Sequence, residues 1–376
     1  SARITALASP SGLQTRRGRL LPSVVSSACW FIEGSPIRWP TSMSFGAQAH
    51  CRPNAMTRIA CMCSHFIGLI ICFPRLLRCI GNNLTGGYKK RMSFLDHLVD
   101  CNRHDMKNFL PLIHRDQRVG WVKRNLVTYF SSFPNAVRCD STKIETNPAL
   151  NTPDLLSGSM AEVGATLTAA GLTNSWRNEP YAVGTRFGEC LFELERAVVP
   201  AFGVRGYGLH LTGFVRKEQE IFIWVPRRTA DRPTYPAQLD NTVAGGHPAG
   251  LSLAENLEKE CAEEAGLSAN LVRRARPTGT IRYRQEIEHG LKDDLIFSYD
   301  LELPADFEPC NSDGEVENFE LWPVNEVMDV VESSDRFKFN CNLVLIDFFV
   351  RHGLIGASHP GRSRLLSGLR GDLIRS

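Results

Sequence analysis

The feature that most constrains this chain is a short helix that must bury a carboxylate. Ser252 and Glu255 have the S-x-x-E spacing of a capping box, which satisfies free amides at a helix start, and Gly266 stands where a helix would end. At about 100° per residue, Glu264 falls inside the apolar stripe of that helix. A buried carboxylate is costly unless a charge compensates it. The fold therefore has to bring a cation to Glu264.

Two further carboxylates share this side of the helix. Glu260 and Glu263 flank Glu264 on the helical wheel, and a glycine-rich loop that contains Gly245 precedes the helix. Converging carboxylates repel one another, and hard oxygen ligands suit Mg²⁺ or Mn²⁺. We therefore predict a divalent-metal site, of the kind that acts on a diphosphate, at these three glutamates.

The alternative for an acidic helix is a solvated face that carries ion pairs. Glu255 and Lys259 are four residues apart, a spacing at which opposite charges support a helix. We expect that pair to form. The glycine loop before the helix favours the metal site for the other three glutamates.

The stretch GGHPAGLSLAENLEKECAEEAGL, residues 245–267, resembles the Nudix box, G-x5-E-x7-R-E-U-x-E-E-x-G-U. Gly245 takes the first glycine, and Glu260, Glu263 and Glu264 take the last three acids. The resemblance implies that these glutamates and the Gly245 carbonyl bind the metal. It also implies a catalytic role for Glu263 and Glu264, with one carboxylate, Glu263 or Glu315, accepting the proton from the attacking water.

Two positions depart from the Nudix pattern. Leu251 stands where the pattern has its first Glu, and Lys259 stands where it has Arg. In the family these positions act mainly as a structural pair, so their change matters less than loss of Glu264 would. Leu251 keeps open one alternative, a catalytically weak Nudix-fold module that binds a ligand or regulates.

The flanking segments, 226–246 and 299–327, resemble the Nudix subfamily related to thiamine pyrophosphokinase, and this likeness covers most of residues 93–353. It implies hydrolysis of thiamine diphosphate, or of its oxidised analogues, to the monophosphate. An isopentenyl diphosphate isomerase would share the fold and a similar N-T-V…G-H-P stretch. That chemistry uses a cysteine in this loop, and residues 241–248 contain none, so we disfavour it.

Other polar residues are candidates for the same site. Glu315 and Glu317 are one residue apart and would share a face of a strand. Related Nudix enzymes use an acid in a comparable place as metal ligand or base; we weigh this evenly against a solvent-facing role for Glu315 and favour the latter for Glu317. Arg227 and Arg228 suit bidentate phosphate binding, although a loop arginine is more often solvated. We take His247 as positional.

Four strand aromatics could stack on a substrate ring, but such residues more often pack in the core. They are Trp224, Tyr283, Phe297 and Tyr299.

Charge is divided unevenly along the chain. Residues 1–91 contain twelve Lys or Arg and one acid, a net charge of +11, whereas the rest carries −8. The net charge therefore does not indicate a nucleic-acid partner for the folded body. The apolar run 66–73 is too short to span a membrane. We expect a small-molecule diphosphate as partner, no nucleic acid and no membrane; a homodimer stays open.

The basic segment 1–91 is acid-poor and rich in Ser and Arg, as transit peptides are. We expect it to be a disordered leader or a non-native extension. We favour a start at Met92 and a cytoplasmic protein, with a mitochondrial or plastid transit peptide as the alternative.

Hydrophobic periodicity, together with what the Nudix resemblance implies, divides the rest of the chain into three segments. Residues 92–203 should form a smaller α+β accessory domain that covers the active site or contributes to substrate selection, with helices at 94–102 and 160–171. Residues 204–354 should form the Nudix domain, and 355–376 a loosely ordered basic tail. Strands are expected at 208–215, 220–225, 278–287, 295–303 and 316–322, and helices at 324–331 and 340–351. Mixed strands with helices on both sides make an α/β/α sandwich.

Overall fold

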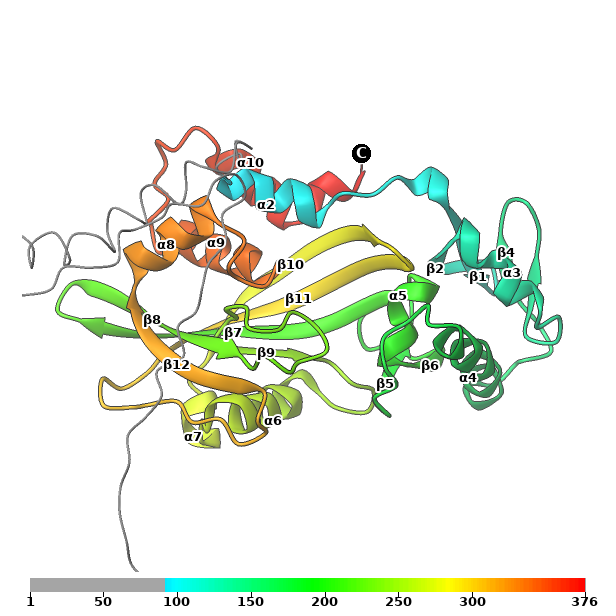
Figure 1. Ribbon diagram of the computed structural model, residues 1–376, viewed down its shortest axis with the longest axis horizontal. Coiled ribbons are helices and arrows are strands. Elements are labelled where there is room, and N and C mark those ends of the chain that lie inside the picture. The colour runs from blue at the N-terminus through cyan, green and yellow to red at the C-terminus, as the bar shows by residue number, and fades with distance from the viewer. Residues whose placement is uncertain (1–91, 376) are drawn as a thin grey trace, which may run out of the picture. The chain divides into compact units, whose positions relative to one another are not determined.

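The computed structural model describes residues 92–375, all of which belong to one compact unit, Tyr88–Ser376 (Figure 1). The disorder expected of residues 1–91 lies outside the described residues. Within 92–375, no helix has both the length and the apolar character needed to cross a membrane.

The N-terminal part contains a four-stranded sheet in the order β2-β1-β4-β3 and a separate hairpin of β5 and β6. The long helix α4 packs on β6, and the two parts of this domain share one hydrophobic core. The strands are β1 Phe109–His114, β2 Gln117–Lys123, β3 Val137–Cys139, β4 Ile144–Thr146, β5 Pro180–Val183 and β6 Phe192–Glu195, and the helices are α3 Val127–Ser131, α4 Pro153–Ala169 and α5 Val199–Phe202. This is the expected α+β domain, although α4 begins seven residues before the predicted 160.

A six-stranded mixed sheet forms the centre of the second part, in the order β10-β11-β7-β8-β12, with β9 paired to β7. Strands β7 and β11 are parallel, and the other pairs are antiparallel. The strands are β7 Arg205–Lys217, β8 Glu220–Arg228, β9 Val243–Gly246, β10 Arg276–Ile287, β11 Gly290–Glu302 and β12 Val316–Pro323. Every predicted strand of this domain is present, as is the β7–β8 hairpin.

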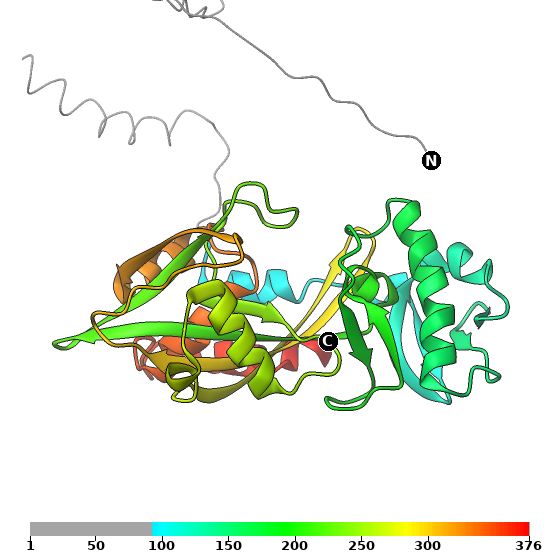
Figure 2. The same cartoon turned by 90° about the horizontal axis from the view of Figure 1, so that it is seen from below.

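Helices cover both faces of this sheet (Figures 1 and 2). One face carries α6 Leu253–Ala265 and α7 Ala269–Val272, which share a core with the aliphatic residues of β7 and β9. The opposite face carries α8 Val324–Ser333 and α9 Cys341–Arg351, in a second core. The α/β/α sandwich is therefore confirmed, and it places α6 beside β9.

Both ends of the described chain join the second core, against the expected boundaries. Helix α2, Phe94–Cys101, buries Phe94 and Leu98 against α9, although its residues lie in the segment assigned to the N-terminal domain. The prediction of a loosely ordered tail is wrong: α10, Arg362–Leu369, buries Leu365 and Leu369 in the same core. The tail sequence looks polar because only one face of a short helix is apolar.

Loss of the α10 anchor should destabilise the whole second part. Because Leu365 is fully buried, we expect Leu365→Ala to lower the free energy of unfolding by about 2–5 kcal/mol. Urea denaturation measures the change. Arg364→Ala, on the exposed face of the same helix, should stay within about 0.5 kcal/mol of wild type. Equal stability of all three proteins would contradict the packing of α10.

Candidate active site

Helix α6 begins and ends as its sequence predicts. The Ser252 side chain accepts a hydrogen bond from the Glu255 amide, the Glu255 carboxylate accepts from the Ser252 amide, and Gly266 adopts a left-handed conformation. Glu255 is therefore engaged at the helix start. The expected Glu255–Lys259 pair is wrong, because Lys259 instead pairs with Glu260 and Glu263.

Glu264 is buried where α6 meets the glycine loop. Its Oε2 accepts a hydrogen bond of 2.8 Å from the Ala244 amide of β9. Burial raises the pKa of this carboxyl to about 8, more than the hydrogen bond to Ala244 lowers it. In such a place the charged carboxylate is unfavourable unless a cation lies nearby.

Glu260 is also buried, and it lies directly against Gly245. A Cβ atom on Gly245 would collide with the Glu260 carboxylate, so only glycine allows this approach. Burial raises the pKa of Glu260, while Lys259 lowers it. One residue further on, the side-chain amide of Asn256 donates to the Gly246 carbonyl at 2.8 Å and holds the loop on α6.

Lys259 acts as the counter-ion of two of these acids. Its ammonium lies 3.0 Å from Glu260 and 2.8 Å from Glu263, whose side chain is half exposed. Within residues 92–375, no group of three His, Cys, Asp or Glu side chains is already arranged around a metal position. The donors nonetheless fit Mg²⁺ or Mn²⁺, since they are all hard oxygens and two are buried carboxylates with raised pKa.

A cavity of about 620 Å³ opens over these carboxylates. That volume lies in the range of small-molecule sites. Basic residues that line it are Lys259, Lys292, Lys338, Arg177, Arg196, Arg228 and Arg232, and acidic ones include the three α6 glutamates, Glu315 and Asp294. The predicted Glu260, Glu263, Glu264, Gly245, Glu315 and Arg228 thus meet in one space.

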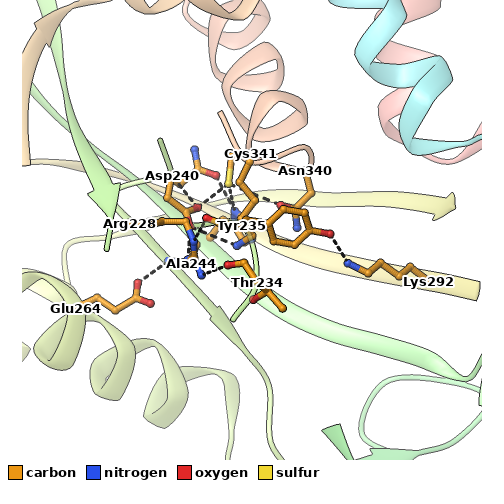
Figure 3. A network of polar contacts seen from close by, with 12 residues as sticks. Arg228, Thr234, Tyr235, Asp240, Ala244, Glu264, Lys292, Asn340 and Cys341 are labelled. Carbon is orange, nitrogen blue, oxygen red and sulfur yellow. Dashed lines mark hydrogen bonds and ion pairs between the residues drawn. The ribbon is translucent and has the colours of Figure 1, made fainter. Parts of the chain in front are cut away.

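Arg228 lines the cavity but is committed to the fold. It pairs with Asp240 at 2.8 Å and donates to the carbonyls of Thr234 and Tyr235 at 3.1 Å each (Figure 3). Those bonds use all three of its nitrogens. Arg227 lies outside the cavity lining and donates to the Ala237 carbonyl.

Asp240 is the centre of a buried charge network beneath the cavity. Burial alone would raise its pKa, but Lys338 and Arg228 lower it to about 2. The neighbouring His210 hydrogen-bonds Asn241 at 2.6 Å, and burial, followed by the Lys338 charge, lowers its pKa to about 4. His210 is therefore neutral in the folded protein at pH 7.

Glu315 also reaches the cavity, where it forms an ion pair with Arg232. Glu317 is exposed and outside the lining. His247 is half buried beside Phe187, and burial lowers its pKa. Of the four strand aromatics, only Tyr283 lines the cavity; Trp224, Phe297 and Tyr299 pack against the α6-side core.

Sequence reasoning missed an aromatic corner of this cavity. The rings of Tyr235 and Phe339 lie 5.3 Å apart, and the Lys292 ammonium sits 5.1 and 4.6 Å from their centres. Asp294 lies nearby and accepts from the Tyr283 hydroxyl at 2.5 Å. The sequence pattern that could have indicated this corner is the pair of charged residues Lys292 and Asp294, which occupy alternate positions of a strand.

The N-terminal domain supplies a wall of the same cavity. The Tyr181 hydroxyl packs on Gly246, where a Cβ atom would overlap it, and the Ala249 amide donates to the Pro180 carbonyl at 2.8 Å. Arg196 lies over the Tyr181 ring at 5.9 Å. No sequence signal tied these residues to the site.

Comparison with known proteins identifies relatives of both parts of the chain. The NUDIX domain family matches residues 208–341, and a domain of unknown function, DUF4743, matches residues 93–206. Nudix hydrolase 24, chloroplastic, of Arabidopsis thaliana is 39% identical over 282 residues, covering 74% of this chain and 77% of that protein. Nudix hydrolase 20, chloroplastic, of the same plant is 35% identical, covering 89% and 91%.

The chain belongs to the Nudix hydrolase family. Among solved structures, the Nudix domain of Shewanella oneidensis NrtR, complexed with ADP-ribose, is 14% identical and covers 40% of this chain and 91% of that one, with a TM-score of 0.33. Nudix enzymes generally use divalent metal ions and hydrolyse a pyrophosphate linkage in a small molecule.

In this Nudix hydrolase, Lys259 should compete with the metal for its ligands. We expect Lys259→Met to tighten Mg²⁺ binding threefold to tenfold, or roughly 1 kcal/mol, because Glu260 and Glu263 lose their internal counter-ion. Isothermal titration calorimetry measures the dissociation constant. Lys107→Met, at an exposed lysine of the N-terminal domain, should bind Mg²⁺ as wild type does. Weaker binding by the Lys259 variant would contradict this role.

Burial of His210 should make the Nudix fold acid-sensitive. Its pKa falls from 6.5 to about 4 on folding, so the unfolded chain binds a proton that the folded chain does not. Burial of neutral His210 therefore costs nothing above pH 6.5. As the pH falls from 6.5 toward 4, the free energy of unfolding decreases by about 3 kcal/mol. Denaturation of wild type and His210→Gln between pH 7 and 4 should show a shallower decline for the variant; parallel curves would contradict it.

Proposed function

We propose that the chain hydrolyses thiamine diphosphate, or an oxidised analogue of it, to the monophosphate and phosphate with Mg²⁺ or Mn²⁺. The observation that carries this proposal is the shared cavity, in which three α6 carboxylates, several lysine and arginine side chains and an aromatic corner meet. A diphosphate joined to a ring needs those three elements: metal ligands, cations and aromatic surface.

Glu260, Glu263, Glu264 and the Gly245 carbonyl would hold the metal. When bound, a divalent ion neutralises phosphoryl oxygens and acidifies an attacking water. With a pKa raised to about 8, Glu264 is largely protonated at pH 7 when no cation is near. A bound metal ion would favour the carboxylate, so metal binding would release this proton. The Glu264–Ala244 hydrogen bond keeps one oxygen of this carboxylate in place.

Glu263 and Glu315 are the candidates for the base. Glu263 is the most exposed of Glu260, Glu263 and Glu264, and its only ion pair within the described residues is with Lys259. Glu315 lies just before β12 and is held by Arg232. Either carboxylate would take the water proton as the water oxygen bonds to phosphorus and the bridging P–O bond breaks, leaving two phosphorylated products.

The aromatic corner supports a ring-bearing substrate. Tyr235 and Phe339 present faces that already attract the Lys292 cation. In Figure 3, Glu264 and the pair Tyr235–Lys292 stand on opposite sides of Arg228, so a diphosphate and a ring could occupy the two sides. The fixed charge of Lys292 would repel the thiazolium cation of thiamine and tolerate the neutral ring of oxothiamine. We therefore favour the oxidised analogue.

We also propose a plastid location. Both Arabidopsis relatives are named chloroplastic, and the match to Nudix hydrolase 20 covers 89% of this chain, more than residues 92–376 contain. Part of the acid-poor segment 1–91 thus aligns with a chloroplastic protein. This favours the transit peptide over the expected cytoplasmic start at Met92. A homodimer stays open.

A diphosphate panel tests the reaction and the substrate together. With Mg²⁺, the protein should release the monophosphate from oxothiamine, oxythiamine or thiamine diphosphate, read by mass spectrometry. Glu264→Gln should lower kcat at least about 100-fold, because a metal ligand and its charge are lost.

Glu258→Gln is the matched control, since Glu258 lies on α6 outside the cavity and pairs with Arg273. It should keep wild-type turnover. If only ADP-ribose releases a monophosphate, the metal-dependent hydrolysis is supported and thiamine compounds are rejected as substrates. Ligand binding without any turnover would favour the regulatory alternative that Leu251 keeps open.

A further inference from the structure

We propose that the N-terminal domain completes the active site by providing Arg196 as a ligand for the substrate diphosphate. This inference rests on the proposed function for the identity of the substrate, but not for the presence of a diphosphate site. It gives the segment that matches DUF4743 a defined role, because that segment then supplies the cation that faces the metal-binding helix across the glycine loop.

Arg196 is close to the metal-binding loop. A Cβ atom placed on Gly246 would lie 3.6 Å from the Arg196 guanidinium carbon. Burial lowers the pKa of Arg196, but Tyr181, Glu179 and, to a smaller extent, Glu260 raise it above its usual value. Arg196 therefore lies close enough to Glu260, one of the carboxylates that would hold the metal, to interact with its charge.

The guanidinium is only partly used by the protein. One nitrogen donates to Glu179 at 2.7 Å, and no other hydrogen bond of this group is present within residues 92–375. Its side chain is 45% exposed, and the residue lines the cavity. The remaining donors can thus take phosphate oxygens, for which the planar fork of arginine is suited. Arg228, in contrast, is held by the protein at each of its three nitrogens, through bonds to Asp240 and two carbonyls.

The backbone around Arg196 is built to fix its direction. Glu195, which is buried, accepts hydrogen bonds from the amides of Arg177, Glu179 and Ala197. The Arg196 amide donates to the Glu179 carbonyl at 2.9 Å. These bonds tie the start of β5 to the end of β6, so the side chain leaves a rigid hairpin rather than a free loop.

The β5–β6 hairpin also contacts the glycine loop on the side away from α6. Tyr181 packs on Gly246, and the Pro180 carbonyl accepts from the Ala249 amide. A diphosphate bound at the α6 carboxylates in this cavity would therefore lie beside the hairpin. Its charge would be neutralised from both sides, by the metal on α6 and by Arg196.

Binding of imidodiphosphate, which resists hydrolysis, tests the inference without turnover. Isothermal titration with Mg²⁺ should show tight binding by wild type and a tenfold to hundredfold loss in Arg196→Gln, the range of a charge-assisted hydrogen bond. Arg196→Lys should recover part of the affinity. Arg138→Gln removes an exposed arginine from β3 of the same domain and should bind as wild type.

Glu179→Gln separates phosphate binding from a merely structural ion pair. If the Arg196–Glu179 pair only supports the fold, this variant should lose affinity as Arg196→Gln does. If Arg196 binds phosphate, removal of its competitor should leave the affinity equal or higher. Unfolding temperatures of all variants identify any loss that comes from misfolding.

The outcomes also separate this inference from the proposed function. Wild-type-like binding and KM in Arg196→Gln, or no imidodiphosphate binding by wild type, would overturn the role of Arg196. Loss of binding in that variant, with no turnover of any thiamine compound by wild type, would uphold Arg196 and reject the thiamine substrate.

Discussion

The close contact between α6 and the glycine loop 244–246 is the constraint on which the rest of the site depends. Three bonds or contacts make it: Glu264 accepts from Ala244, Glu260 lies against Gly245, and Asn256 donates to Gly246. Of the three, the Gly245 contact depends on the absence of a side chain, because a Cβ atom there would collide with the Glu260 carboxylate. Glu260 and Glu264 are thereby buried beside the cavity, where Lys259 of the same helix and basic residues from other segments offset the negative charge.

The basic residues that line the cavity come from several segments of the chain. Lys259 comes from α6 itself, Arg232 from the loop after β8 and Lys338 from the segment before α9, while Arg196 comes from the N-terminal domain. Buried or half-buried charges of opposite sign need one another, because removal of one partner leaves the other uncompensated. The two domains are therefore coupled at the site by electrostatics as well as by the packing of Tyr181 on Gly246.

Helix capping and strand patterning correctly predicted the features that depend on residues close together in the sequence. The capping box, the left-handed Gly266 and the strands of the sandwich follow from residues near in sequence, whereas the resemblance to the Nudix box placed Gly245 with Glu260. The partner of Lys259 could not be predicted in this way, because Glu255 has two competing uses and the capping box prevails. The packing of α10 and the approach of Arg196 to Gly246 join segments far apart in the chain, and only the tertiary fold brings them together.

The most direct measurement is the anomalous scattering of Mn²⁺ in crystals grown with imidodiphosphate. The account predicts a manganese peak among Glu260, Glu263 and Glu264, with a phosphate group bridging that ion and the Arg196 guanidinium. A manganese ion bound elsewhere, or a diphosphate held away from the N-terminal domain, would contradict it.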